Sequence, residues 1–413
     1  MAEYGLWYDL SLPRVAAQRL WPREALRWAR LRPGPLPEPR FSGGGWIRLR
    51  PRLAGICGSD TALLLGKSSP FLSGLTGFPA VLGHEVLALV DSPNAPWPRG
   101  TWVVVDPSLA CAARGLPLCR FCAAGHPERC ARRDEGSLGP GMLLGYHPDL
   151  PGGWATAMWA PVGQVHPVPS GLGERRAVLT EPAAIVHHGL GLVPARPERL
   201  LVIGGGTIGL LALGLALERW TGITADILVR HAHQAELARA LGASAVLPGE
   251  PGALESRIHE LTGGRRVPQL RVPGIPEPPP FFTDGYDLVI DAVGSAATLE
   301  TALAAARPGG TVLAVGATGP VRADLTPLWA REVAVVGTYG YGPGDFTGAL
   351  EALGEQALPF ERLVTHRFPL PAWRKAVRAA VRHRRYRSLK VVFEIQGGRW
   401  EGGARDVALA FSS

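Results

Sequence analysis

The sequence predicts an α/β protein with a doubly wound parallel-sheet domain and a second domain rich in β-strands. Short apolar strands alternate with helical segments over residues 187–326. Brief apolar runs among frequent glycine and proline fill residues 1–186, and the pattern changes again over residues 327–413. A chain of 413 residues can form two ordinary domains, each with a sizeable core.

The clearest local signal lies at residues 200–217, LLVIGGGTIGLLALGLAL. Four apolar residues predict a buried strand, a G-x-G-x-x-G turn follows at once, and a helix-length apolar run comes next. A dinucleotide site needs this order, because the glycines allow a tight turn, close approach to a pyrophosphate and close helix packing. An uncharged stretch of this length could also span a membrane, but glycines directly after a strand argue against that reading. We expect the cofactor to contact Gly204, Gly206, Thr207, Ile208 and Gly209.

Further signals extend this pattern into a Rossmann domain over residues 187–326. Strands are predicted at residues 227–229, 286–291 and 310–316. Helices are predicted at residues 234–241 and 296–307, the first ending at Gly242 and the second at Pro308-Gly309-Gly310.

The remaining segments predict a twisted, partly open β-barrel with long loops and a C-terminal part that mixes helix and strand. Strands are expected at residues 5–9, 46–50, 80–82, 87–90, 102–105 and 389–395, and helices at 346–353 and 372–381. The proline-rich residues 267–283 indicate an exposed insertion loop, and residues 396–413 give no strong signal.

Composition indicates a soluble globular protein, with 46% hydrophobic and 19% charged residues. The start, MAEYGLWYDL, lacks the basic and apolar regions of a signal peptide, so we expect a cytoplasmic protein. The net charge of +8 comes largely from scattered arginines, with no basic stripe interleaved with aromatics. We therefore expect neither a nucleic-acid nor a membrane partner.

Four of the five cysteines fall in one stretch, residues 111–130. Cys119-x-x-Cys122, with Cys130 eight residues on and Cys111 before them, has the spacing of a zinc chelate. Disulfides and chance free thiols are the alternatives. A cytoplasmic location makes disulfides unexpected, and four thiols within one short stretch of loop are hard to assign to core packing. We interpret the cluster as a structural tetrathiolate zinc site.

The fifth cysteine, Cys57, lies in GICGSD, and His84 and Glu85 follow in GHE, with Glu181 further on in TEP. One thiolate, one imidazole and one carboxylate can hold a catalytic zinc while leaving a position for water or substrate. Each residue alone also has an ordinary structural interpretation, so spacing by itself leaves the question open.

In this order, GICGSD, GHE, the cysteine-rich loop, EPAAIVHHG and GGGTIG resemble the zinc-containing medium-chain dehydrogenase/reductase family of alcohol, polyol, threonine and aldose dehydrogenases. The resemblance covers residues 46–395. It implies a GroES-like catalytic domain interrupted by a Rossmann domain, with a C-terminal segment that returns to the first. It also implies a homo-oligomer, either a dimer or a tetramer.

The resemblance implies roles for the residues that match. Cys57 and His84 would bind the catalytic zinc, with Glu181 as the third ligand and Glu85 as the competing one. Asp60 would orient the ligand histidine and Ser59 would relay the alcohol proton. Two positions depart from the family: Ala62 replaces a relay histidine, and Leu116 stands where the structural loop usually has its first cysteine.

The cofactor assignment depends on the end of the second strand. An NAD site would carry an acid there, but the chain has Arg230 and His231, and Asp226 comes too early. A cation suits a 2′-phosphate, so we favour NADP over NAD; an ordinary loop arginine is the alternative. Lys390 resembles a family position near the cofactor phosphates.

These features predict hydride transfer between NADP or NAD and a hydroxyl of an alcohol, polyol or sugar. Residues 68–78 and 138–154 are expected to line the substrate pocket or its rim. Two alternatives remain: a zinc-independent quinone or alkene reductase on the same fold, and a zinc-bearing nucleic-acid-binding protein. The Cys57 and His84 pair argues against the first, and the complete set of candidate ligands argues against the second.

Overall fold

The computed structural model describes residues 3–39, 45–249, 252–270, 273, 277–316, 319–355 and 357–395, so the predicted tail at 396–413 lies outside it. The chain forms two compact units. The first consists of the described residues of Met1–Ala184, Gly340–Gly354 and Glu361–Ser413. The second consists of those of Ile185–Tyr339 and Glu355–Phe360.

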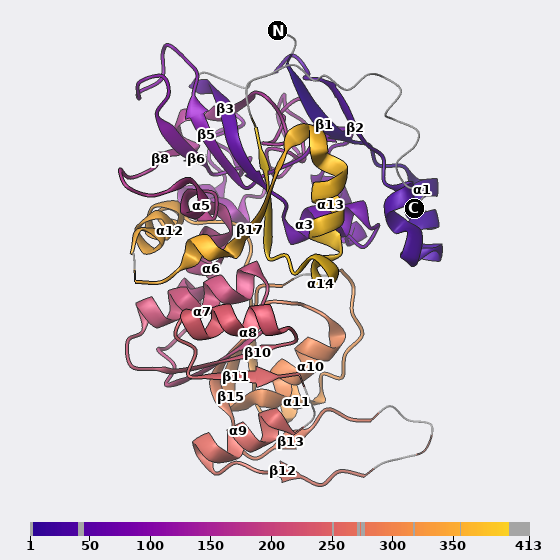
Figure 1. The fold of residues 1–413 in the computed structure, drawn as a ribbon, viewed down its shortest axis with the longest axis vertical. Coiled ribbons are helices and arrows are strands. Elements are labelled where there is room, and N and C mark those ends of the chain that lie inside the picture. Colours follow the sequence, from indigo (N-terminus) through magenta and orange to yellow (C-terminus); the bar gives the residue numbers. More distant parts are fainter. Residues whose placement is uncertain are drawn as a thin grey trace. The chain divides into compact units, whose positions relative to one another are not determined.

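The second unit is built on a six-stranded parallel sheet (Figure 1). Its strand order is β11–β10–β9–β14–β15–β16, which in order of appearance is the 3-2-1-4-5-6 arrangement of dinucleotide-binding Rossmann sheets. The strands are β9 (Arg199–Ile203), β10 (Thr224–Val229), β11 (Ala245–Pro248), β14 (Tyr286–Asp291), β15 (Ala306–Ala314) and β16 (Ala334–Gly337). The helices are α7 (Thr207–Arg219), α8 (Ala232–Ala240), α9 (Ala253–Thr262), α10 (Ala296–Ala305) and α11 (Thr326–Ala330).

The strand, turn and helix predicted around residues 200–217 are confirmed. The turn lies between β9 and α7, and Gly204 has a φ of +107°, a value that favours glycine. A Cβ at Gly209 would lie 1.8 Å from the carbonyl oxygen of Gly204. The third glycine is therefore what lets the helix start so close to the strand.

The predicted stop of the helix at residues 308–310 is wrong. Helix α10 gives way directly to β15 at Ala306, and Gly309 lies inside the strand with a φ of +68°. Pairing with β14 begins at Tyr286 opposite Ala306 and shifts register before Leu288, so these residues form an irregularity within the strand. Parallel pairing outweighs the local turn signal. Strand β16, which pairs with β15, also carries this unit past residue 326 to Tyr339.

The first unit contains a three-stranded sheet, β2–β1–β4, and a seven-stranded sheet with the order β17–β18–β3–β5–β6–β8 and β7 beside β3. Within the described residues this order is an open path, as expected for a partly open barrel. The strands are β1 (Tyr4–Tyr8), β2 (Leu31–Pro35), β3 (Trp46–Gly55), β4 (Ala80–Val81), β5 (Val86–Val90), β6 (Trp102–Val105), β7 (Met158–Pro161), β8 (Val165–Pro167), β17 (Val364–Pro369) and β18 (Lys390–Glu394). Strand β18, near the C-terminus, pairs antiparallel with β3, so the yellow and indigo segments of Figure 1 meet in one sheet.

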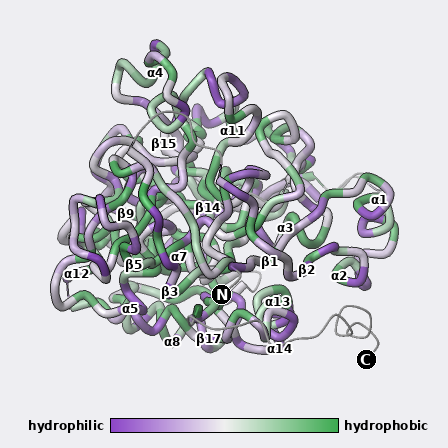
Figure 2. Tube along the Cα trace, turned by 90° about the horizontal axis from the view of Figure 1, so that it is seen from above, coloured by the Kyte–Doolittle hydropathy of each residue, from purple (hydrophilic) through white to green (hydrophobic). Residues whose placement is uncertain are grey.

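Helices of the first unit cover these sheets or flank their loops. They are α1 (Leu12–Leu20), α2 (Ala25–Trp28), α3 (Gly58–Leu64), α4 (Arg120–Ala123), α5 (Glu174–Ala177), α12 (Asp345–Gly354), α13 (Trp373–Val381) and α14 (His383–Tyr386), while α6 (Thr180–Gly191) continues into the second unit. Figure 2 shows α14 as strongly hydrophilic, as its sequence HRRY requires.

Two local features differ from or refine the sequence analysis. Helices α1 and α2 were not predicted, because their frequent Pro, Trp and Arg hide the short helical period. The proline-rich insertion is bracketed by two short paired strands, β12 (Arg266–Val267) and β13 (Phe281–Phe282). Among the described helices, none has the length and apolar character needed to cross a membrane.

The close approach at the glycine turn predicts a contrast between two substitutions. Gly209→Ala places a Cβ against fixed backbone and should lower the free energy of unfolding by at least about 1–3 kcal/mol. Gly206→Ala is the matched control, because its Cβ would meet nothing within 4 Å. Urea unfolding of both variants measures this. Equal stability of the two would contradict the packing account.

Candidate active site and metal centres

Cys57 and Asp60 are placed by the N-terminus of helix α3, directly after strand β3. Cys57 is the N-cap residue, and its side chain accepts from the backbone N–H of Asp60. Asp60 Oδ2 in turn accepts from the backbone N–H of Cys57 at 2.9 Å. This reciprocal capping box fixes both side chains. Ser59 lies between them and is exposed, whereas Asp60 is fully buried.

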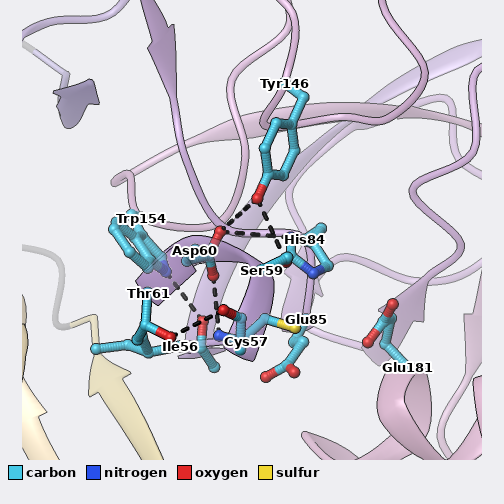
Figure 3. Close-up of polar contacts among 12 residues, drawn as sticks. Ile56, Cys57, Ser59, Asp60, Thr61, His84, Glu85, Tyr146, Trp154 and Glu181 are labelled. Carbon is cyan, nitrogen blue, oxygen red and sulfur yellow. Dashed lines mark hydrogen bonds and ion pairs between the residues drawn. The ribbon is translucent and has the colours of Figure 1, made fainter. Parts of the chain in front are cut away.

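His84 precedes strand β5 and lies beside this helix end (Figure 3). Its Nδ1 is 3.7 Å from Asp60 Oδ1, and its ring is within hydrogen-bond reach of the Cys57 side chain. Burial lowers the pKa of His84, but the Asp60 carboxylate and Cys57 outweigh it, so the pKa is raised well above its usual value. Nδ1 is buried and has no hydrogen-bond partner among the described residues.

The carboxylate of Glu85 forms a buried ion pair with Lys390. Lys390 Nζ lies 2.5 and 2.6 Å from the two carboxylate oxygens of Glu85, and both side chains are almost fully buried. A Cβ at Gly55 would lie 1.8 Å from Glu85 Oε2, so the glycine makes room for this carboxylate. The structure therefore places Lys390 against Glu85; its expected contact with cofactor phosphates stays a prediction.

Glu181 lies in helix α6 and has a neutral partner instead. The hydroxyl of Tyr341 donates to Glu181 Oε1, and both residues are buried. Burial raises the pKa of Glu181 to about 7, although His84 opposes the shift. Figure 3 shows Glu181 at some distance from the group formed by Cys57, Ser59, Asp60 and His84.

The charges of this region fit a bound cation. Lys390 is paired with Glu85, whereas the buried carboxylates of Asp60 and Glu181 accept hydrogen bonds from the neutral phenols of Tyr146 and Tyr341. Buried anions need compensating charge, and a thiolate, an imidazole and a carboxylate are zinc ligands. Of the described residues, only the cysteine cluster gathers three or more such ligands within 4.8 Å of one another. The ligand atoms of Cys57, His84 and Glu181 therefore do not all lie as close to one another as those of the cysteine cluster.

The four clustered cysteines meet as predicted. Their sulfur atoms lie within 4.8 Å of one another, and every described cysteine is a free thiol, which rules out the disulfide alternative in this structure. Backbone N–H groups of Cys119 and Arg132 donate to the sulfurs of Cys111 and Cys130, each at 3.4 Å. Hydrogen bonds from Ala131 and Cys122 lower the pKa of Cys119 to about 6. The group fits a tetrathiolate zinc site, with Cys111 in place of a cysteine at Leu116.

A buried arginine supports the cysteine loop. Arg114 is 1% exposed and donates to the carbonyl oxygens of Leu109, Glu135, Gly139 and Gly141. These contacts tie together the two ends of the loop. Its positive charge also lies near Cys130 and Cys111, where it would partly balance bound thiolates.

The cofactor candidates lie at the ends of β9 and β10. Arg230 follows β10 and is exposed, and His231 caps α8 with its ring stacked on His233 at 5.7 Å. Asp226 is instead buried within β10, where it binds Arg257 and accepts from the hydroxyl of Tyr286 at 2.9 Å. Asp226 is the only acid of β10, and its side chain is bound in the interior of the unit rather than exposed at the end of the strand.

Two tyrosines of the site were not assigned by the sequence analysis. Tyr146 donates to Asp60 Oδ1 at 3.0 Å and lies 3.3 Å from Ser59 Oγ, and Tyr341 donates to Glu181. Tyr146 does fall in the segment expected to line the pocket, residues 138–154. No local pattern marks either residue, because their partners lie 86 and 160 positions away.

Comparison with known proteins agrees with this geometry. The family model described as "Alcohol dehydrogenase GroES-like domain" matches residues 43–170, and "Zinc-binding dehydrogenase" matches residues 207–355. A sorbitol dehydrogenase of Arabidopsis thaliana is 27% identical over 327 residues, 78% of this chain and 81% of that protein. This chain belongs to the zinc-containing medium-chain dehydrogenase/reductase family.

Solved structures share the fold. A zinc-binding dehydrogenase from Sinorhizobium meliloti 1021, bound to NADP, has a TM-score of 0.68 at 23% identity, over 95% of this chain and 99% of that one. An alcohol dehydrogenase from Escherichia coli CFT073, complexed with NADH, has a TM-score of 0.70 at 21% identity, over 95% and 100%.

The cysteine cluster predicts a separable metal site. Cys111→Ser should lower the zinc content by about one ion per chain and destabilise the fold, because loss of a structural metal is among the costliest single changes, above about 4 kcal/mol. Plasma emission spectroscopy and thermal unfolding measure both. Ala112→Ser, at the exposed neighbouring position, is the control. Unchanged zinc content in Cys111→Ser would remove Cys111 from the site.

Proposed function

We propose that this chain is a zinc-dependent dehydrogenase that transfers hydride between NADP or NAD and a hydroxyl of an alcohol, polyol or sugar. The observation that carries the proposal is the group formed by the half-buried Cys57 and the buried Asp60 and His84, with the exposed hydroxyl of Ser59 at its edge. Its position in a chain with polyol dehydrogenase relatives supports the substrate class.

Each residue has a task in this reaction. Cys57, His84 and Glu181 would hold a zinc ion, whose chemistry when bound is Lewis-acid activation of the substrate hydroxyl, while a bound nicotinamide supplies the hydride acceptor. Ser59, which is exposed, accepts the proton that the alcohol releases as it passes its own hydroxyl proton outward to water. Asp60 orients His84. The oxidised products are a carbonyl compound, the reduced nicotinamide and that proton.

Among the two carboxylates, we assign the third ligand position to Glu181. Glu85 already has both oxygens on Lys390, whereas Glu181 has a single phenol donor. A carboxylate held by a neutral donor can turn to a cation more easily than one in a buried ion pair.

NADP is the favoured cofactor. Arg230 is exposed at the end of β10, and Asp226 is buried against Arg257, so a cation rather than an acid meets the expected position of the ribose 2′ substituent. The turn Gly204–Gly209 and the N-terminus of α7 would hold the pyrophosphate.

We also propose a homo-oligomer in which β16 contributes to the interface. This strand ends the described sheet of the second unit, and Val335 within it is 42% exposed. Trp329 in α11 is 71% exposed, and apolar side chains beside an edge strand suit association with a second copy. A cytoplasmic location and the lack of nucleic-acid and membrane partners stay predictions.

The function is tested by turnover. The purified protein is offered NADP and NAD separately with a panel of simple alcohols, polyols and aldoses, with and without a strong chelator. We expect reduced nicotinamide to form with NADP, and chelation to abolish its formation. Chelator-insensitive reduction of alkenes or quinones, with no alcohol oxidised, would favour the zinc-independent reductase instead.

The ligand assignment is tested by two substitutions. Glu181→Ala should release the catalytic zinc, keep the zinc of the cysteine cluster, and lower turnover at least about a hundredfold. Zinc analysis and steady-state kinetics are run beside Glu85→Ala. Full zinc and activity in Glu181→Ala, with loss of both in Glu85→Ala, would show that Glu85 is the ligand.

A further inference from the structure

Tyr146 is a buried tyrosine whose hydroxyl reaches two residues of the proposed reaction. Its Oη lies 3.0 Å from Asp60 Oδ1 and 3.3 Å from Ser59 Oγ (Figure 3). The side chain is 8% exposed, whereas Ser59 is exposed. The hydroxyl therefore connects the solvent-facing and the interior part of the site.

The surrounding backbone and rings hold Tyr146 in place. Gly145, with a φ of +86°, lies so close to Gly83 that a Cβ on it would meet the Gly83 carbonyl oxygen at 3.1 Å. The backbone N–H of Gly77 donates to the carbonyl of Tyr146 at 2.9 Å. The ring centroids of Phe78 and His84 lie 6.3 and 5.6 Å from that of Tyr146. The phenol thus has little freedom to turn.

The hydrogen bonds of this group can be counted. Asp60 is fully buried, and its Oδ2 already accepts from the Cys57 backbone, so Oδ1 needs a donor. Tyr146 has one hydroxyl proton, and the carboxylate is the stronger acceptor. With that proton on Asp60, the Tyr146 oxygen can act towards Ser59 only as an acceptor. Because the one phenol proton is used on Asp60, a hydrogen bond across the 3.3 Å between the two hydroxyls has Ser59 as its donor and Tyr146 as its acceptor.

We propose that Tyr146 is a positioning residue for alcohol oxidation. Resting on the proposed function, it acts through Ser59 and Asp60. With its own proton directed at Tyr146, Ser59 turns its oxygen lone pairs to its exposed side, where they accept a hydrogen bond from the substrate hydroxyl and so orient it. The same phenol keeps Asp60 beside His84. Tyr146 is a side-chain contact of Ser59, and Ala62, three positions further on, has no hydrogen-bonding side chain.

The test is the substitution Tyr146→Phe, which removes Oη and keeps the ring. We expect kcat for the best alcohol to fall about tenfold to a hundredfold, because misdirected groups cost rates of this order. KM, the NADP dissociation constant, zinc content and thermal unfolding should stay near the wild-type values. Tyr8→Phe is the matched control. It removes a phenol hydroxyl from the same core, where its partner is the Leu63 carbonyl at 3.4 Å.

A double-mutant cycle separates positioning from general damage to the fold. If Tyr146 acts through Ser59, Tyr146→Phe should lower kcat far less in a Ser59→Ala background than in the wild type. The proposal is overturned if Tyr146→Phe keeps kcat within about twofold of the wild type, or if the two losses multiply. Absence of alcohol oxidation by the wild-type protein would instead overturn the proposed function, and this inference with it.

Discussion

A buried ion pair between Glu85 and Lys390 joins the stretches from which the candidate site is built. Glu85 follows His84 and directly precedes β5, and Lys390 begins β18, which pairs with the strand leading to Cys57. Lys390 also lies 3.5 Å from the carbonyl of Ile56, so one ammonium group contacts both stretches. A buried charge left without its partner costs about 3–5 kcal/mol. The C-terminal segment is therefore part of the site, although 305 positions separate the two partners.

The proposed metal binding depends on a difference between the partners of two buried glutamates. Glu85 and Glu181 are the same residue type at similar burial, yet one faces an ammonium and the other a phenol. The first carboxylate is paired with a cation, whereas burial raises the pKa of the second, Glu181, to about 7, although His84 opposes the shift. A buried site that disfavours the charge of a carboxylate favours that charge once a cation binds beside it.

The cysteine cluster depends partly on sequence spacing and partly on the folded loop. Cys119, Cys122 and Cys130 are close in sequence, so their spacing alone predicted a chelate. Cys111 lies eight positions before Cys119, and its place in the cluster depends on the folded turn between the two residues. Arg114 stabilises that turn by binding carbonyl groups on the far side of the loop, a role that its sequence neighbourhood does not indicate.

The sequence by itself determined what local chemistry dictates: the turn at Gly204–Gly209, the alternation of strands and helices around it, and the thiol, imidazole and carboxylate residues available for metals. These are set by backbone freedom and by apolar periodicity over a few residues. Only the tertiary structure decided that residues 308–310 continue a strand, because β14 pairs with the residues on either side of them, at Ala306 and again from Thr311. It also decided that Lys390 meets Glu85, that Tyr341 meets Glu181 and that Tyr146 meets Asp60 and Ser59. Such contacts between distant residues leave no periodic trace in the chain, since each depends on how packed strands and loops bring single side chains together.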